Sequence, residues 1–320
     1  MTREDIVNTA RAILAKAGFD VSSNLRLRSI CFNFVARRDE TLIVVKVLGN
    51  VDAFTRAGAN ELKTLSEALG GNPLVIGEGT GSGPLEDGIV YTRFKIPIIS
   101  VKTLSEYLIE DVPPFIFAAP GGLYVNLDGD TLRDIRNTQN ISLGTLAEAA
   151  GVSRRTIQLY ETGMGAMIDA ALRLEEFLNT PLIEPLDPFS HGAEEREKEG
   201  SPLERSQALQ TNSPSLDRMM TIGYTITPIV RSPFDAVSRD KDHGIVVLTG
   251  VDSQDTALID RAIAASELSN MSKRPSVIIV RNKPAEDSIA NTALVSDDEL
   301  KKIDDMTVLN DLILTRSTRR

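Results

Sequence analysis

The segment that most restricts the fold of this chain spans residues 141–163, where two short helical patterns meet at a single glycine. Ser142 and Ser153 are good N-caps for the two helices. Gly151 supplies the positive φ that ends the first helix and makes the turn. Ala147 is small because the two helices cross there at close range. We therefore expect a compact helical pair, packed inward through Leu146, Ala147, Val152, Ile157 and Tyr160.

The second helix of this pair, residues 153–162, leaves a row of polar side chains outside or at its edge. Arginines in its first turn can reach guanine O6 and N7 in a DNA major groove. The first turn of the preceding helix can abut a phosphate. The candidate DNA-binding residues are therefore Ser142, Leu143, Gly144, Ser153, Arg154, Arg155, Thr156, Gln158 and Leu159.

These residues resemble the Cro/lambda-repressor-type helix-turn-helix family. The resemblance covers residues 131–180 and rests on a small residue, a Gly-Val-Ser turn, an isoleucine and a Tyr-Glu-x-Gly sequence. It implies that Arg154, Arg155 and Leu159 touch bases. Leu143 stands where the family often places a polar residue on DNA, so an apolar side chain weakens that contact.

The whole chain also resembles a family of archaeal helix-turn-helix regulators, in which this module sits between two α/β regions. The strings that carry the resemblance are residues 35–39, 118–126 and 153–157. It implies a cytoplasmic transcription factor that acts on double-stranded DNA, with no effector known. We expect a homodimer that binds two half-sites about one helical turn apart.

The charge balance leaves an alternative open. The chain has a net charge of −10, and residues 131–180 hold five basic and six acidic side chains. Lys and Arg supply most non-specific DNA affinity. A protein-interaction scaffold whose helix-turn-helix does not read DNA is therefore the second interpretation, although the local charge of the docking face decides.

Several other classes of protein are disfavoured by composition. Cys31 is the one cysteine, so the chain has no internal disulfide, and its two histidines are far apart, which disfavours a zinc site. The apolar runs are too short to cross a bilayer, and the N-terminus is not a signal peptide. We expect a cytoplasmic protein with no membrane contact, no metal and no cofactor.

The pattern along the chain predicts α/β (or α+β) flanking domains, degenerate restriction-endonuclease-like, around a central all-α helix-turn-helix domain. The expected boundaries are 1–115, 130–188 and 221–320, with a mobile linker at 189–220. In the first domain we expect helices at 4–18, 53–69 and 101–108, and strands at 25–35, 42–48, 73–76 and 89–94. A connector at 113–129 is expected to hold a short hairpin at 123–127.

Residues 32–45 and 234–247 echo one another, with six of fourteen positions identical without gaps. A helix and a strand are expected after each. The C-terminal domain is therefore interpreted as a repeat of the N-terminal one, although two short hairpins could match this well by composition alone.

A remnant metal-dependent nuclease is the third, enzymatic, interpretation. Such sites pair an Asp with an acidic-x-Lys triplet on the next strand. The first copy has Asn33, Val44 and Lys46 at these positions, and the second has Asp235 followed by Val246 and Leu248. Neither copy offers two carboxylates, so the chain is not expected to be an enzyme. The glycine-rich residues 77–83 lack the ending of a P-loop and are expected to form a flexible loop.

Overall fold

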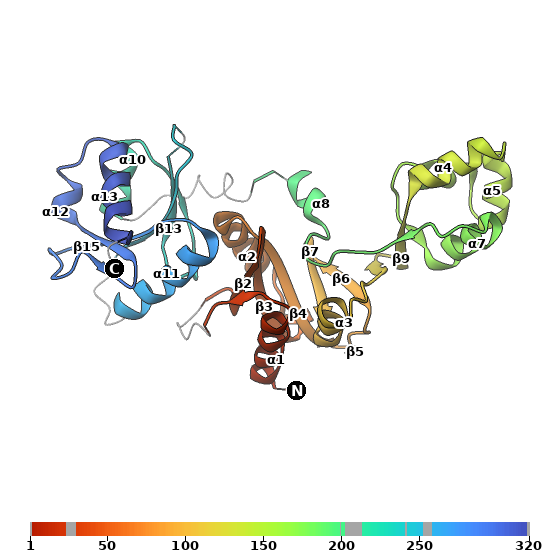
Figure 1. The fold of residues 1–320 in the computed structure, drawn as a ribbon, viewed down its shortest axis with the longest axis horizontal. Helices are drawn as coiled ribbons and strands as arrows, with labels where there is room; N and C mark the ends of the chain where they lie inside the picture. The colour runs from red at the N-terminus through yellow and green to blue at the C-terminus, as the bar shows by residue number, and fades with distance from the viewer. Residues whose placement is uncertain are drawn as a thin grey trace. The chain divides into compact units, whose positions relative to one another are not determined.

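The computed structural model describes residues 2–23, 30–198, 200–201, 213–240, 242–251 and 258–318. The chain forms two compact units, each assembled from segments far apart in the sequence (Figure 1). The first unit comprises Met1–Ile13, Leu48–Asp52 and Val75–Gly192. The second unit comprises Leu14–Val47, Ala53–Leu74 and Ala193–Arg320. Helix α1 (Arg3–Lys16) and strands β3 (Thr41–Asn50) and β4 (Asn72–Thr80) contribute residues to both units.

The first unit contains a mixed sheet. Strand β4 runs parallel to β7 (Ile96–Ser100), and β7 is antiparallel to β6 (Ile89–Arg93). Strand β8 (Ile116–Ala119) lies parallel to β6 and forms a hairpin with β9 (Gly122–Leu127). The connector at 113–129 is thus more regular than expected, because its hairpin includes β8 as well as residues 123–127. Helix α3 (Val101–Ile109) follows β7 and is capped by Ser100, whose Oγ accepts the Thr103 N–H at 3.0 Å.

Two features of this sheet differ from the prediction. Strand β7 was missed because it is buried on both faces and has no alternation for a pattern to detect. The expected glycine-rich loop is instead largely strand, since β4 continues to Thr80 and pairs with β5 (Gly83–Pro84). Glycine is needed there for close packing: a Cβ on Gly77 would lie 2.4 Å from Val51 Cγ1.

The second unit contains two sets of strands. Strand β2 (Phe34–Arg38) pairs antiparallel with β1 (Asp20–Val21) and with β3, and α2 (Arg56–Leu69) belongs to the same unit. The strand expected at 25–35 begins at Phe34, and residues 24–29 lie outside the described part of the chain. The C-terminal sheet has six strands in the order β12-β13-β14-β15-β17-β16. They are β12 (Thr225–Pro228), β13 (Ala236–Arg239), β14 (Val246–Val251), β15 (Ser276–Val280), β16 (Ser288–Ile289) and β17 (Thr292–Ser296).

Helices complete the C-terminal half of the second unit. Side chains from α10 (Pro214–Ile222), α12 (Asp297–Leu300) and α13 (Met306–Thr318) join the sheet in one core, and α11 (Leu258–Ser272) packs against β15 and β17. This core includes Met219, Tyr224, Val295 and Ile313. Among the described residues, no helix combines the length and the apolar composition that crossing a membrane would need.

Part of the segment expected to be a mobile linker at 189–220 is helical. Residues Ala193–Lys198 form α8, and α10 begins at Pro214. The Glu and Lys of the charge run are good helix formers, and proline is favoured in the first helical turn. Residues 202–212 lie outside the described part of the chain.

The two α/β regions share a strand order, and this likeness extends beyond the similar residues 32–45 and 234–247. The run β1-β2-β3 matches β12-β13-β14, with all pairs antiparallel. The run β4-β7-β6 matches β15-β17-β16, with a parallel pair followed by an antiparallel pair. Helix α2 precedes β4 and α11 precedes β15 at the same place in each run.

Candidate nucleic-acid interface

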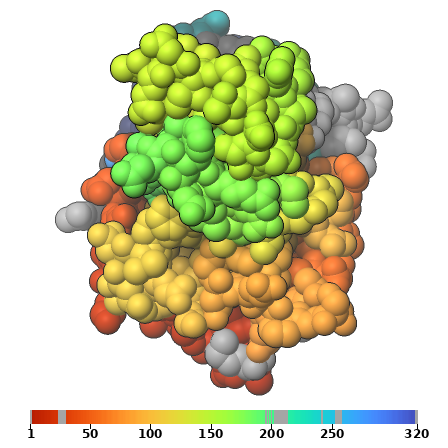
Figure 2. Space-filling model, turned by 90° about the vertical axis from the view of Figure 1, so that its right-hand side faces the viewer, coloured from red at the N-terminus to blue at the C-terminus, as the bar shows by residue number. Residues whose placement is uncertain are grey.

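The central part of the first unit is a helical module of four helices. These are α4 (Gly129–Thr138), α5 (Leu143–Ala150), α6 (Arg154–Tyr160) and α7 (Ile168–Leu178). Figure 2 shows it as a contiguous yellow-green and green surface. Short strands β10 (Ala166–Met167) and β11 (Ile183–Glu184) both pair with β9. The helices pack around one core that includes Leu132, Leu146, Ile157, Tyr160 and Leu174.

The turn between α5 and α6 has the local structure predicted from the sequence. Ser142 Oγ accepts the Thr145 N–H at 3.0 Å, and Ser153 Oγ accepts the Thr156 N–H at 3.0 Å. Gly151 ends α5 with φ of 69°. A Cβ at Gly151 would be in the left-handed region and 2.7 Å from Arg173 Nη1. The two caps and this glycine therefore set where each helix begins and ends.

The inward face is also as predicted. Leu146, Ala147, Ile157 and Tyr160 are all buried, and Val152 is half-buried against the same core. Burial raises the pKa of the Tyr160 hydroxyl, which is consistent with its place in the core. Helix α6 is thus held by its apolar face, and its other face is presented outward.

The predicted outward residues of α6 occupy two kinds of environment. Arg154, Arg155 and Gln158 are exposed, whereas Thr156 and Leu159 are half-buried. The Thr156 and Ser153 hydroxyl oxygens lie 2.8 Å apart, so both hydroxyls are used within the cap. The exposed arginines are consequently the side chains of α6 best placed to reach a ligand outside the module.

The structure brings the start of α5 and the start of α6 together. Arg154 Nε lies 3.0 Å from where a Cβ on Gly144 would be, so the guanidinium rests against the first turn of α5. Ser142 is exposed beside this turn. Leu143 is half-buried and packs against the core of the module, which explains why an apolar residue stands at this position.

An ion pair that the sequence analysis did not assign fixes α6 to α4. Arg136 Nε and Nη2 lie 2.5 Å and 3.1 Å from the two carboxylate oxygens of Glu161, whose side chain is 8% exposed. The hydrogen bond to Glu161 raises the pKa of the Arg136 guanidinium. Glu161 is the glutamate of the Tyr-Glu-x-Gly sequence, so the motif itself was the signal. Its partner on α4 could not be identified from spacing alone.

The module's acidic side chains do not all face outward. Glu161 pairs with Arg136, and Glu175 Oε1 accepts the backbone N–H groups of Leu182 and Ile183 at 2.6 Å and 2.8 Å. These two carboxylates stabilise the module internally. The excess of acidic over basic residues at 131–180 therefore does not describe the surface around Arg154 and Arg155.

The positions of a nuclease site are occupied by structural contacts. Asn33 Oδ1 accepts the Val47 N–H at 2.8 Å, and Asp235 Oδ2 accepts the Val251 N–H at 2.7 Å. Asp235 also forms an ion pair with Arg261 at 2.6 Å. The Asp235 side chain is 46% exposed, and its carboxylate binds the end of β14 and neutralises a guanidinium.

The hairpin register also corrects the alignment of the two copies. The Asn33 N–H donates to Val45, and the Asp235 N–H donates to Thr249. The second hairpin is thus two residues longer, and the counterparts of Val44 and Lys46 are Leu248 and Gly250. The sequence alignment without gaps had instead assigned Val246 and Leu248 to these two positions. Within the described residues, no three His, Cys, Asp or Glu side chains gather in a way that could hold a metal ion.

Comparison with known proteins agrees with this geometry. A sequence profile of the PD-(D/E)XK superfamily domain matches residues 3–114, and a helix-turn-helix profile matches residues 132–184. The chain is 40% identical to a protein of Methanocella arvoryzae, across 100% of this chain and 98% of that protein. It is 39% identical to a protein of Methanosarcina acetivorans (99% and 98%) and 38% identical to one of Natronomonas pharaonis (99% and 99%). All three are provisionally named HTH-type transcriptional regulatory proteins. No solved structure matches the chain.

Proposed function

Because the chain belongs to the family of archaeal HTH-type transcriptional regulatory proteins, we propose that it regulates transcription by docking α6 in the DNA major groove. The observation that carries the proposal is the pair of exposed arginines in the first turn of α6. The buried face of α6 and the caps of Ser142 and Ser153 keep this turn in one orientation. A rigid helix that presents two arginines is suited to bidentate contacts with guanine.

We assign different roles to the surrounding residues. Arg154, Arg155, Gln158 and Leu159 read base edges, because they lie on the outer or lateral sides of α6. Ser142, Leu143 and Gly144 place the first turn of α5 against a phosphate, which its N–H groups favour. Ser153 and Thr156 contribute by holding the start of α6, since their hydroxyls bond to one another and to the backbone.

The same proposal includes a homodimer and a symmetric operator. One module offers one short reading helix, and a regulator of this type gains specificity by placing two such helices on half-sites one turn apart. The α/β regions at 1–115 and 221–320 would supply the contacts between subunits. We propose that the domain at 130–188 reads DNA and that the protein works in the cytoplasm.

We also propose that the chain is not a nuclease, although residues 3–114 match the PD-(D/E)XK superfamily. The Asn33 amide oxygen and the Asp235 carboxylate each accept a hydrogen bond from a backbone N–H group. Arg261 also forms an ion pair with Asp235. Leu248 and Gly250 offer no metal ligand on the next strand. Such a fold without its carboxylates is better suited to binding than to Mg²⁺-dependent cleavage.

The decisive experiment is selection of genomic DNA by the purified protein, with bound fragments sequenced at two salt concentrations. A regulator should enrich one palindrome-like motif, and its affinity should fall steeply with salt. The Arg154→Ala/Arg155→Ala double variant should lose the motif while it keeps its fold by circular dichroism. Absence of enrichment at both salt concentrations would contradict the proposal and favour a protein-interaction scaffold.

A further inference from the structure

Two halves of the second unit contact each other around the C-terminal ends of two helices, α2 and α11. The N-terminal half comprises residues 14–47 and 53–74, and the C-terminal half comprises residues 213–318 as far as the structure describes them. Helix α2 ends at Leu69, and α11 ends at Ser272. Each of these ends is contacted by side chains of the other half.

The end of α11 is held by the N-terminal half. Arg37 Nη1, on β2, donates to the Met271 carbonyl oxygen at 2.8 Å. Lys273 Nζ, just beyond the helix, lies 3.5 Å from Glu40 Oε1. Carbonyl groups in the last turn of a helix have no partner within the helix, and they carry the negative end of its dipole. The Arg37 guanidinium therefore both caps and neutralises the end of α11.

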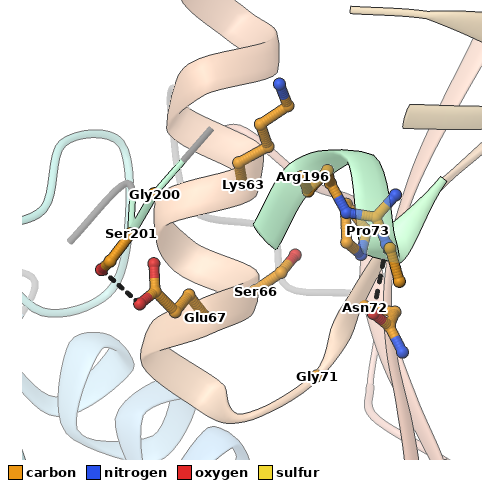
Figure 3. A pocket seen from close by; sticks show the side chains of 10 residues that line it. Lys63, Ser66, Glu67, Gly71, Asn72, Pro73, Arg196, Gly200 and Ser201 are labelled. Carbon is orange, nitrogen blue, oxygen red and sulfur yellow. Dashed lines mark hydrogen bonds between the residues drawn. The ribbon is translucent and has the colours of Figure 1, made fainter. Parts of the chain in front are cut away.

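The end of α2 is held by the C-terminal half. Arg274 Nη1 donates to the Glu67 carbonyl oxygen at 3.4 Å, and a Cβ on Gly70 would lie 2.9 Å from Arg274 Nη2. Burial lowers the pKa of the Arg274 guanidinium, and the positive charge of Arg239 lowers it further. A second arginine of the C-terminal half therefore lies close to the one that caps α2. Figure 3 shows this end of α2, where the Glu67 side chain accepts the Ser201 hydroxyl beside a pocket.

The two sets of contacts are reciprocal. Arg37 on β2 and Arg239 on β13 occupy the same position in their hairpins. Helices α2 and α11 precede equivalent strands, and each is followed by a residue with positive φ, 73° at Gly70 and 57° at Lys273. Each half thus brings an arginine of its second strand close to the helix end of the other half. Such reciprocity is the property of an interface with two-fold symmetry.

Other polar contacts join the halves outside the helix ends. Arg231 Nε lies 3.1 Å from Glu61 Oε2 on α2, and the Cys31 N–H donates to the Arg231 carbonyl oxygen at 2.9 Å. Ser23 Oγ donates to Glu267 Oε2 on α11 at 2.7 Å. Backbone and side-chain groups both take part, so the halves are docked in one defined arrangement.

We propose that the two halves are paired as the subunits of a symmetric dimer are paired, with the C-terminal half as a built-in partner for the N-terminal half. Because Arg274 follows α11 by two residues and reaches α2, the negative ends of both helices lie close together, and the arginines offset their repulsion. The pairing surface is closed within one chain, and it does not supply the contact between the chains of the proposed homodimer. The inference depends only on contacts within the second unit.

Cutting the folded chain between the halves tests the pairing. A site-specific protease sequence with flexible Gly-Ser flanks is inserted between residues 206 and 207, and the purified full chain is cut there. We expect the two fragments to elute together from a size-exclusion column in a 1:1 ratio. Fragments that elute separately would overturn the proposal.

Single substitutions in the cut protein test the reciprocity. Arg37→Gln, Arg239→Gln and Arg274→Gln should each weaken the association of the fragments about 10-fold, because each removes a charged group at a helix end. Arg281→Gln is the matched control: this exposed arginine follows β15 at the end opposite to Arg274, and its substitution should leave the association unchanged. Circular dichroism checks the fold of each uncut variant. An effect of Arg37→Gln without one of Arg239→Gln, or no effect of any of the three, would overturn the two-fold pairing.

The uncut double variant Arg37→Gln/Arg274→Gln tests whether the surface is closed within the chain. Its solution mass by light scattering should equal that of the unchanged protein. A change from two chains to one would place the surface between chains and overturn the proposal. None of these measurements uses DNA, so the pairing and the proposed DNA-reading function can fail separately.

Discussion

Arg154 and Arg155 are neighbours in the sequence, but the structure gives them different surroundings. Both arginines are exposed, and Arg154 rests against the first turn of α5 at Gly144. We expect Arg154 to be the more ordered of the two before DNA binds.

The first prediction concerns these two arginines. Arg154→Ala and Arg155→Ala should each cost about 1–3 kcal/mol of operator binding and relax specificity at one base pair. The measurement is a titration of the selected operator and of its single-base variants. Arg133→Ala is the control in the same module, because Arg133 lies on α4 in an ion pair with Asp130. Unchanged affinity in both test variants would exclude the proposed docking of α6.

The second prediction concerns the ion pair between α4 and α6. Glu161→Gln should destabilise the protein by about 2–3 kcal/mol, because it leaves Arg136 without its bidentate partner. That figure lies below the cost at a fully buried pair, since the Arg136 side chain is 19% exposed. Chemical denaturation measures it. The double variant Arg136→Met/Glu161→Leu should recover much of the lost free energy of unfolding. If the double variant instead loses as much as the two single variants together, the two side chains are not directly coupled.

The third prediction uses a titratable pair in the C-terminal half. Asp240 is fully buried, and its Oδ2 lies 2.9 Å from His243 Nδ1 and accepts the Asn310 amide at 2.8 Å. Burial acts to raise the pKa of the Asp240 carboxyl, but hydrogen bonds from the backbone and side chain of His243 outweigh it and the pKa is lowered. The same hydrogen bond raises the pKa of His243 above its usual value.

Since the pKa of His243 is raised in the folded state, its contribution to stability is complete below about pH 6.5 and declines as the pH rises through the folded pKa. The melting temperature should therefore fall as the pH rises from about 6.5 through the folded pKa of His243. His243→Gln should remove this part of the slope, whereas His191→Gln, which changes the other histidine, should retain it. An identical slope in His243→Gln would show that the pair does not contribute.

At the scale of the elements, the helical module depends on a close crossing that side-chain patterns do not reveal. In space, the first residue of α4, Gly129, lies against the last residues of α6. A Cβ on Gly129 would lie 2.6 Å from the Tyr160 carbonyl oxygen and 2.9 Å from the Glu161 carbonyl carbon. Backbone atoms cannot move aside as the end of a flexible side chain can. Gly129 is therefore required by packing between two helices.

The fourth prediction follows from this crossing. Gly129→Ala should destabilise the protein by about 1–3 kcal/mol, as overpacking in a core does, and should weaken operator binding because α6 is displaced. Gly49→Ala is the matched control: Gly49 lies in β3, and a Cβ there would have no neighbour within 4 Å. Equal thermal stability of the two variants would mean that α4 can shift at no cost.

At the scale of the whole molecule, the proposed symmetric operator requires two chains. The fifth prediction is a solution mass of twice 34.8 kDa by light scattering, and two chains bound to each operator. The two half-sites should lie about one helical turn apart, and insertion of about five base pairs between them should reduce affinity because it rotates one half-site to the opposite side of the duplex. A single chain bound per operator would contradict the dimer.

The amino-acid sequence by itself determined the helical module. Its caps at Ser142 and Ser153, its turn at Gly151 and its buried face depend on residues close in the chain, so local rules were sufficient. The helices α1, α2 and α3 were predicted for the same reason, since each carries a helical period of apolar residues. The outward position of Arg154 and Arg155 followed directly from the inward position of Ile157 and Tyr160.

Only the tertiary structure decided what depends on residues far apart in the chain. It showed the partner of Glu161, the contact that requires Gly129, the fully buried strand β7 and the two-residue shift that aligns Lys46 with Gly250. It also brought Arg274 to the end of α2, where it contacts the carbonyl group of Glu67, 207 residues earlier in the chain. Ion pairs, close backbone contacts and strand register are set by packing between distant segments, and a periodic pattern along one segment carries no record of its partner.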